Sequence, residues 1–295
     1  MEVSFMGVRD GVETMGGEVA AEWIDPHLPT VFSRWHPYHE AVLRESSAAV
    51  IAAAGVRPGD RVLDVGSGAG VPALDVARVV GPDGRVVATD PSPIFVAALE
   101  ANAAAAGLPW LEVVRADALH LPGQAGSFDA VTCHMGVMFF LDVQAGLRSI
   151  RRMLRPHGRT AFVAWGNEAA NQFFASFWDG ARAHLPAAPP PDAPSNPVDA
   201  PGPMRFAAAG TLSAALREAG FADVHEEART IQMVWPGPGE SLVRQWLEIS
   251  RIEERVSGDR VEALRADVLR SVNRFAEGDT VRMTAEIVVA SGVGN

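Results

Sequence analysis

The chain has 295 residues, of which 48% are hydrophobic, and its formal net charge is −11, with arginine supplying all 25 basic side chains. Phosphate binding needs a basic face, so this charge argues against nucleic acid as a partner, while the lack of lysine excludes Schiff-base chemistry and phosphate-binding loops that end in Gly-Lys. The single cysteine, Cys133, excludes intrachain disulfides and multi-cysteine metal sites, and the absence of an apparent signal peptide or a long apolar run predicts a cytoplasmic protein without a membrane span.

Strands and helices are expected to alternate along the first part of the chain. Short β-branched runs are followed by glycine- or aspartate-containing loops and then by helical patterns. This alternation predicts βαβ units, a mainly parallel sheet and helices on both of its faces. The expected strands are 61–65, 85–89, 111–115, 128–133 and 160–165, and the expected helices are 39–54, 71–80, 94–106 and 143–154.

The pattern changes after Gly166, where helical segments interrupt the core. We expect helices over 167–185, 211–219 and 241–275, an extended stretch over 222–235, and a strand over 280–290. The last two strands would add to the sheet in antiparallel fashion, and the inserted helices would form a cap over its carboxyl end. The expected organisation is a lid segment (1–38), a core (39–166), a first cap insertion with a Pro-rich crossing (167–207), a core continuation (208–235), a second cap insertion (236–277), and a final strand and tail (278–295).

A glycine loop follows the first expected strand. The residues 62–70 read VLDVGSGAG, and the G-x-G-x-G spacing differs from the G-x-G-x-x-G fingerprint of dinucleotide sites. Asp64 lies within the otherwise apolar strand, where a buried carboxylate costs several kcal/mol unless it is hydrogen-bonded or paired. The loop therefore favours a ligand without a pyrophosphate, with a simple strand-to-helix turn as the alternative.

Two further acids each follow a strand of their own. Asp90 closes the second strand about 20 residues beyond the loop, where an acid can accept hydrogen bonds from ribose hydroxyls. Asp117 follows the third strand and is suited to an exocyclic adenine amine. A helix cap for Asp90 and a turn role for Asp117 are the alternatives.

Taken in order, these motifs resemble those of class I S-adenosylmethionine (SAM)-dependent methyltransferases, most of all the ubiquinone/menaquinone-biosynthesis-like small-molecule group. The resemblance covers roughly residues 40–165 and implies a Rossmann-like α/β fold whose 39–166 core binds SAM. The motifs that carry it are VLDVGSGAG (62–70), VVATDPS (86–92), ADALHLP (116–122), SFDAVTC (127–133) and MLRPHG (153–158).

The resemblance also assigns roles in cofactor binding. The glycine loop would line the methionine part of SAM, Asp90 would bind the ribose and Asp117 the adenine. The cofactor-binding residues implied in this way are Asp64, Gly66, Ser67, Gly68, Asp90, Pro91, Asp117, Ala118, His134 and Met135.

Methyl transfer from a sulfonium requires mainly positioning and exclusion of water, and a base only when the acceptor is protonated. Relatives often carry a His-His pair where this chain has Phe139 and Phe140, so an apolar pocket wall is expected there. His134 and Tyr38 are the candidate catalytic residues, and His36 is a candidate substrate contact. Cofactor contact or pocket lining is the alternative role of His134.

Aromatic side chains are concentrated in the inserted segments, where core packing is the alternative to a ligand role. No His/carboxylate cluster occurs near the fourth strand, so no metal is expected. The expected substrate pocket consists of Tyr38, Phe139, Phe173, Phe177, Trp178 and Trp235.

The sequence therefore predicts an enzyme that transfers a methyl group from SAM to a small, fairly apolar acceptor and releases S-adenosylhomocysteine. Quinone-like, phenolic, polyketide and isoprenoid natural products are the acceptor classes considered, with methylation on oxygen or carbon. Two alternatives stay open, a protein of this fold with a non-methylating reaction such as cyclisation, and an NAD(P)-dependent oxidoreductase. A homodimer is also left open.

Overall fold

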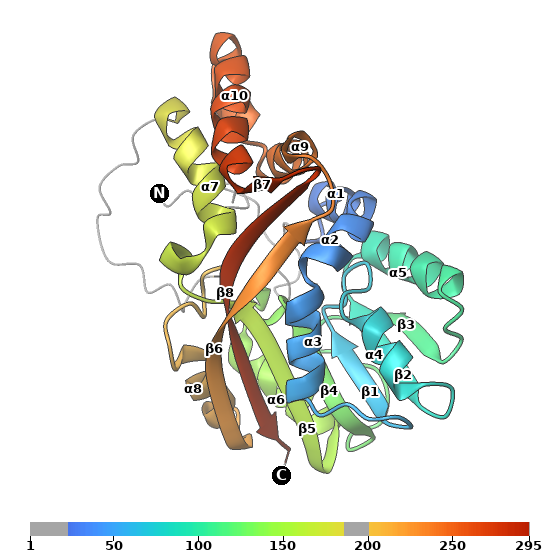
Figure 1. Cartoon of the computed structure of the whole chain (residues 1–295). Coiled ribbons are helices and arrows are strands. Elements are labelled where there is room, and N and C mark those ends of the chain that lie inside the picture. Colours follow the sequence, from blue (N-terminus) through green and yellow to red (C-terminus); the bar gives the residue numbers. More distant parts are fainter. Residues whose placement is uncertain (1–22, 186–200, 295) are drawn as a thin grey trace.

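The strands form one twisted sheet that organises the molecule. The computed structural model describes residues 23–185 and 201–294, and within them the sheet has eight strands in the order β3-β2-β1-β4-β5-β8-β6, with β7 beside β8 (Figure 1). The strands are β1 (Arg61–Val65), β2 (Arg85–Asp90), β3 (Leu111–Arg115), β4 (Phe128–His134), β5 (Leu154–Trp165), β6 (Ala222–Trp235), β7 (Ala276–Glu277) and β8 (Thr280–Val293).

Strands β1 to β5 are parallel, and β8 lies between β5 and β6 and is antiparallel to both. This topology confirms the expected Rossmann-like sheet with an antiparallel last strand. Strand β1 is buried along all but its first residue, as expected for a parallel strand covered on both faces. Because the parallel strands end at the same edge, the loops that follow them meet there.

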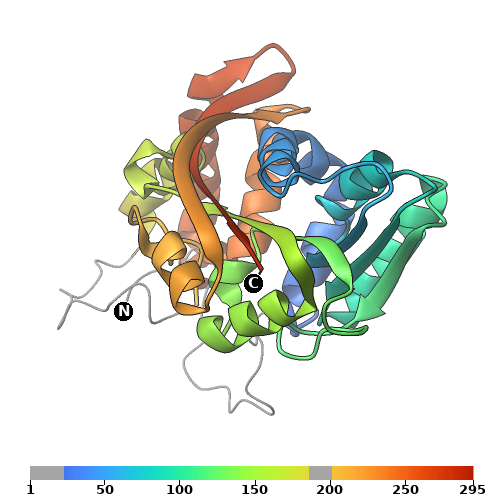
Figure 2. The same ribbon diagram turned by 90° about the horizontal axis from the view of Figure 1, so that it is seen from below.

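Helices pack on both halves of the sheet. Helices α4 (Ala73–Val80) and α5 (Pro93–Ala105) pack on β1 to β3, and α6 (Val143–Met153) and α8 (Thr211–Glu218) pack on each other and on the β5–β8–β6 half (Figure 2). Two expected boundaries in this part of the chain are wrong. The helix expected over 39–54 is two helices, because Leu43 leaves the helical conformation at φ −96° and ψ 9°.

These two helices are α2 (His36–Val42), which begins earlier because Pro37 suits a first helical turn, and α3 (Arg44–Ala53). Helix α1 (His27–Arg34) precedes them within the expected lid and contacts α5 and α9. The rest of that lid, residues 1–22, lies outside the described residues, as does most of the Pro-rich crossing, residues 186–200. The second wrong boundary is at β5, which starts at Leu154 instead of the expected residue 160 and bulges at 155–158.

The inserted segments form three helices at the end of the sheet next to α1 (Figure 1). They are α7 (Gln172–Ala181), α9 (Gly239–Ser250) and α10 (Val261–Val272). The single helix expected over 241–275 is interrupted because Arg251 adopts a left-handed conformation at φ 49° and ends α9. Two short 3₁₀ turns, Ile252–Arg255 and Gly258–Arg260, then lead to α10.

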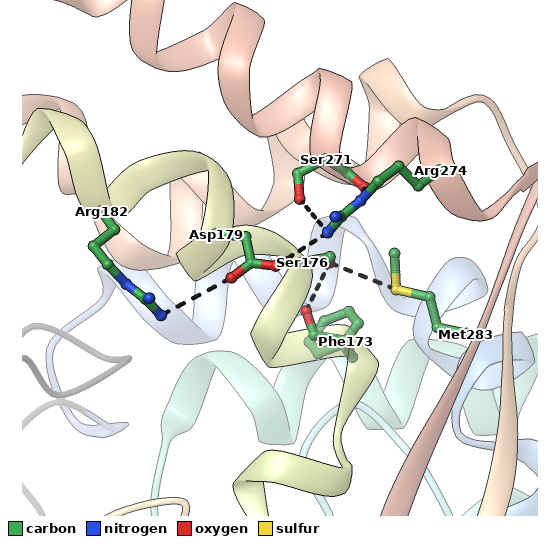
Figure 3. Close-up of polar contacts among 7 residues, drawn as sticks. All are labelled: Phe173, Ser176, Asp179, Arg182, Ser271, Arg274 and Met283. Carbon is green, nitrogen blue, oxygen red and sulfur yellow. Dashed lines mark hydrogen bonds and ion pairs between the residues drawn. The ribbon is translucent and has the colours of Figure 1, made fainter.

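Helices α7 and α10 cross at close range. A Cβ atom on Gly180 would lie 2.4 Å from the Cα of Val268, so only glycine permits this crossing. Arg274 extends the contact by binding Asp179 at 3.1 Å, beside the Ser176 hydroxyl that donates to the Phe173 carbonyl (Figure 3). The two helices are therefore fixed to each other by packing as well as by polar contacts.

Candidate active site

A cavity opens where the carboxyl ends of β1, β2, β3 and β4 meet the N-terminal helices. The glycine loop and the residues that follow the strands form one part of the lining, which we call the loop end. Aromatic and histidine side chains form the other part, which we call the aromatic end. Its lining residues are Trp23, Phe32, His36, His39, Leu43, Val65, Gly66, Ser67, Gly68, Ala69, Val71, Asp90, Pro91, Phe95, Ala116, Asp117, Ala118, His134, Met135, Gly136, Phe139 and Phe140.

The glycine loop is held against β2 by its own backbone. The N–H groups of Gly66 and Ser67 both donate to the Thr89 carbonyl, each at 2.9 Å. Gly66 and Gly68 have positive φ angles of 72° and 52°, which favour glycine. A Cβ atom on Gly68 would meet no atom within 4 Å, although the residue lines the cavity. The loop thus leaves open space beside its backbone, as a bound ligand requires.

Asp90 connects the glycine loop to the start of α5. Its Oδ2 accepts from the Gly68 N–H and its Oδ1 from the Ser92 N–H, both at 2.9 Å. Burial raises the pKa of this carboxyl to about 6, although the two hydrogen bonds and the nearby charge of Asp64 also act on it. Each oxygen keeps a second lone pair, so Asp90 can order the loop and still accept from a ligand hydroxyl.

Asp64 is fully buried beneath the loop. Its Oδ1 accepts from the Thr132 hydroxyl at 2.5 Å, whereas Oδ2 has no partner among the described residues. Burial raises the pKa of Asp64 to about 6, partly offset by the hydrogen bonds from Thr132 and Ser67. A buried carboxylate oxygen without a partner is costly, and Asp64 is not among the residues that line the cavity, so it can act on a ligand there through its charge rather than by direct contact.

Asp117 follows β3 and lines the loop end of the cavity. Its Oδ1 accepts from the backbone N–H groups of Leu119 and His120 at 2.7 and 2.9 Å. These two bonds order the loop that brings Ala116 and Ala118 to the cavity. The turn role considered from sequence is therefore present, alongside a position on the cavity wall.

His134 ends β4 and reaches toward α3. Its Nε2 lies 2.9 Å from the Ser46 hydroxyl, and the Ser46 hydroxyl lies 2.9 Å from the Leu43 carbonyl. Burial lowers the pKa of His134 to about 4, so the imidazole is neutral at physiological pH. Met135 follows it on the cavity wall at φ 53°.

Helix α2 brings two more histidines to the cavity. Burial lowers the pKa of His36, although the charge of Glu40 acts to raise it. Burial and the charge of His36 lower the pKa of His39 to about 3. His39 Nε2 lies 2.8 Å from the Gln245 side-chain amide on α9. His36 was expected near the substrate from sequence, whereas His39 was not. The i, i+3 spacing, which places both on one helix face, is the signal that could have found it.

The far end of the cavity is aromatic. The ring of Trp23 packs edge-on against Phe139 at 4.9 Å between centroids and lies 5.5 Å from Phe32 and 6.1 Å from Phe95. Phe139 was expected in the pocket from sequence, while Trp23, Phe32 and Phe95 were not. No arginine is present among the described residues that line the cavity, and the chain has no lysine.

Five other aromatics expected in the pocket lie outside this cavity. Tyr38 stacks on Trp235 at 4.6 Å, which fixes α2 on β6. Phe177 is fully buried and stacks on Trp246 at 4.7 Å, with Trp178 edge-on to the same indole. Phe173 packs on the rings of Phe177 and Trp165.

Two other groups bear on the chemistry. Cys133 is fully buried, and burial with the charge of Asp64 raises the pKa of its thiol, so it is a poor nucleophile. Over the described ranges, no three or more histidine, cysteine, aspartate or glutamate side chains are grouped to hold a metal ion. The same ranges contain no helix long and apolar enough to cross a membrane.

Comparison with known proteins places this site in a family. Residues 62–158, which carry the glycine loop and both strand-end acids, match the family model described as "Methyltransferase domain". The chain is 32% identical over 240 residues to nocamycin O-methyltransferase of Saccharothrix syringae, an alignment that covers 80% of this chain and 86% of that protein.

Two further proteins are similar over different extents. The 2-phytyl-1,4-naphtoquinone methyltransferase of Trichormus variabilis is 34% identical over 124 residues, which is 42% of this chain and 54% of that protein. The crystal structure of the [4+2]-cyclase SpnF superposes with a TM-score of 0.52 at 18% identity and covers 90% of this chain and 94% of that one. The second likeness concerns the fold alone.

Proposed function

The chain belongs to the class I SAM-dependent methyltransferases, and from that premise we propose that it methylates a hydroxyl oxygen of a small, neutral, flat natural product. SAM is its methyl donor. The observation that carries the proposal is the composition of one cavity, which joins the glycine loop and the strand-end acids to an end lined by aromatic rings and neutral imidazoles. The O-methyltransferase relative supports the choice of oxygen.

The residues of the loop end fit SAM. Space beside Gly68 is open, and the unpartnered Oδ2 of Asp64 together with the ionisable Asp90 favours a cofactor that carries positive charge. In this assignment the loop holds the methionine part, Asp90 the ribose and Asp117 with Ala118 the adenine. The neighbouring walls are formed by Pro91, His134 and Met135.

The aromatic end fits the acceptor. Rings from Trp23, Phe32 and Phe139 bury flat apolar surface, and aromatic contacts in edge-on or offset geometry contribute about 0.5–1.5 kcal/mol each beyond burial. An anionic acceptor would need a cation, and the described lining residues supply none. Phenolic, enolic or quinol-type hydroxyl compounds therefore fit best.

The chemistry requires little beyond this arrangement. When bound, SAM supplies an electrophilic methyl group for in-line displacement. The chain's own residues hold the two reactants in one water-poor cavity, which raises their effective concentration. A protonated hydroxyl must also lose its proton, and neutral imidazoles on the cavity wall can accept it.

The test is a screen of neutral phenols, quinols and polyketide enols with SAM, read out as S-adenosylhomocysteine release and as a methylated product by mass spectrometry. We expect release only with an acceptor present, and a product heavier by one methylene unit. Turnover of an acceptor without any S-adenosylhomocysteine would favour cyclisation or another non-methylating reaction and contradict the proposal.

A further inference from the structure

The side chain of His134 contacts the Ser46 hydroxyl on α3. We propose that His134 is the general base, taking the hydroxyl proton of the acceptor on Nδ1, and that Ser46 is the positioning residue that selects the tautomer required for this. The inference rests on the proposed function, since it concerns a hydroxyl acceptor in the same cavity. His134 and Ser46 both lie in the part of the chain that the structure describes.

The Ser46 hydroxyl has a single proton to donate. Ser46 is fully buried near the N-terminus of α3, and its hydroxyl donates to the Leu43 carbonyl at 2.9 Å, an acceptor that has no proton to give. With that proton on the Leu43 carbonyl, the Ser46 oxygen accepts in its 2.9 Å contact with His134 Nε2. In this arrangement Nε2 carries the ring proton, and Nδ1 is left with a lone pair.

Nδ1 is the ring nitrogen of His134 that is left available for a ligand. His134 lines the cavity, and neither of its ring nitrogens is among the buried polar side-chain atoms that lack a partner in the described residues. Because Nε2 contacts Ser46, Nδ1 is the nitrogen that can meet a ligand in the cavity. Burial lowers the pKa of His134 to about 4, which keeps that lone pair free of a proton above pH 5.

The step balances without any further reactant. The acceptor oxygen forms a bond to the methyl carbon as the carbon–sulfur bond of SAM breaks, and the electron pair of that bond goes to sulfur. The hydroxyl proton passes to Nδ1 of His134, which becomes an imidazolium whose Nε2–H still donates to Ser46. The products are the methyl ether, S-adenosylhomocysteine and a protonated base that then returns its proton to solvent.

The tautomer can be measured without an acceptor. ¹⁵N NMR of the full chain labelled at histidine, with SAM bound, should show His134 protonated at Nε2 and unprotonated at Nδ1. Ser46→Ala should mix the two tautomers, whereas Ser47→Ala should not, because the neighbouring Ser47 is equally buried but donates to Asp75 on α4. A His134 ring protonated at Nδ1 in the wild type would overturn the proposal.

Kinetics with a hydroxyl acceptor from the screen give the second test. His134→Gln should lower kcat, measured at saturating SAM, by about 100-fold or more, within the usual range for a lost general base. Ser46→Ala should lower kcat about tenfold at unchanged acceptor KM, Ser46→Thr should restore most of it, and Ser47→Ala should match the wild type.

A pair of acceptors separates a base from a structural role. For the more acidic of two phenols that are both protonated at the assay pH, His134→Gln should lose far less activity than for the less acidic one, because its proton is easier to remove. An equal loss with both phenols would show that His134 only positions or packs, and would overturn the proposal while the methyl transfer itself stands. Absence of transfer to any hydroxyl by the wild type would instead overturn the proposed function.

Discussion

Two buried carboxyl groups, those of Asp64 and Asp90, set the electrostatics of the cofactor end. Both follow from sequence position, because an acid inside or at the end of an apolar parallel strand needs a partner that the strand does not supply. Position alone did not reveal that Asp90 binds the Gly68 N–H, or that one oxygen of Asp64 has no partner. Those facts depend on how closely β1, β2 and β4 approach.

The affinity for SAM should depend on pH through Asp90. Burial raises its pKa to about 6, so the carboxyl is ionised at pH 7.5 and takes up a proton as the pH falls through 6. The protonated form attracts a cationic cofactor less, so SAM affinity should fall between pH 7 and pH 5, by at most about tenfold per pH unit for one group. Calorimetry at several pH values measures this.

Asp90→Asn should remove that component of the pH dependence and weaken SAM binding by about tenfold at pH 7.5, because a charge-assisted hydrogen bond contributes about 1.5–3 kcal/mol. Asp142→Asn is the matched control, since Asp142 caps α6 outside the cavity and accepts from the Ala145 N–H. An affinity change of less than twofold in folded Asp90→Asn would reduce Asp90 to a helix cap.

The glycine loop gives a second prediction at this scale. Gly68→Val would place a side chain in the open space on the cavity wall and should abolish measurable SAM binding by calorimetry. Gly107→Val controls for backbone strain, because Gly107 also has a positive φ and open surroundings but lies away from the cavity. Equal SAM affinity in both variants would refute the assignment of the loop.

Among the elements, the N-terminal helices and α9 act as one unit over the aromatic end. Glu248 on α9 accepts from Arg34 and from the Trp35 indole, both at 3.0 Å, and Gln245 lies 2.8 Å from His39. The cap thus reaches the cavity through α1 and α2. Sequence patterns predicted helices in both regions but not this contact, because residues more than 200 positions apart carry it.

The aromatic residues of the two regions should therefore respond differently to truncation. Phe139→Ala opens the cavity wall and should raise the acceptor KM several-fold, with a smaller loss of melting temperature than Phe177→Ala, since Phe139 lines the cavity and contacts Trp23 there. Phe177→Ala removes a fully buried ring stacked on Trp246 and should cost about 3–5 kcal/mol of stability. Thermal melts and steady-state kinetics on both variants decide this.

The opposite result would place the acceptor site among the helices of the cap. If Phe177→Ala changed the acceptor KM without lowering the melting temperature, the α7–α9 packing would have to open into a binding site. The break in the expected helix over 241–275 shows why sequence alone misjudged this region. Arg251 and the two 3₁₀ turns fold α10 back against α7, and that return depends on the Gly180 crossing.

For the whole molecule, a mainly parallel sheet with helices on both faces was predictable from the alternation of strands and helices, together with the right-handed crossovers that parallel strands require. The position of β8 between β5 and β6 follows less directly from the sequence, since two antiparallel neighbours of similar length can be ordered either way. The acceptor end was the least predictable part. Its walls combine α1, α2, α5 and the segment after β4, which no single sequence window contains.

One measurement tests the central claim most directly, namely that a single cavity brings SAM and a neutral hydroxyl acceptor together. The wild-type protein would be incubated with SAM labelled with ¹³C in the methyl group and with the neutral phenols and enols that release S-adenosylhomocysteine, and ¹³C NMR would locate the label in the product. The account predicts the label on oxygen of a neutral acceptor. A label on carbon or nitrogen, or transfer confined to anionic acceptors, would contradict it.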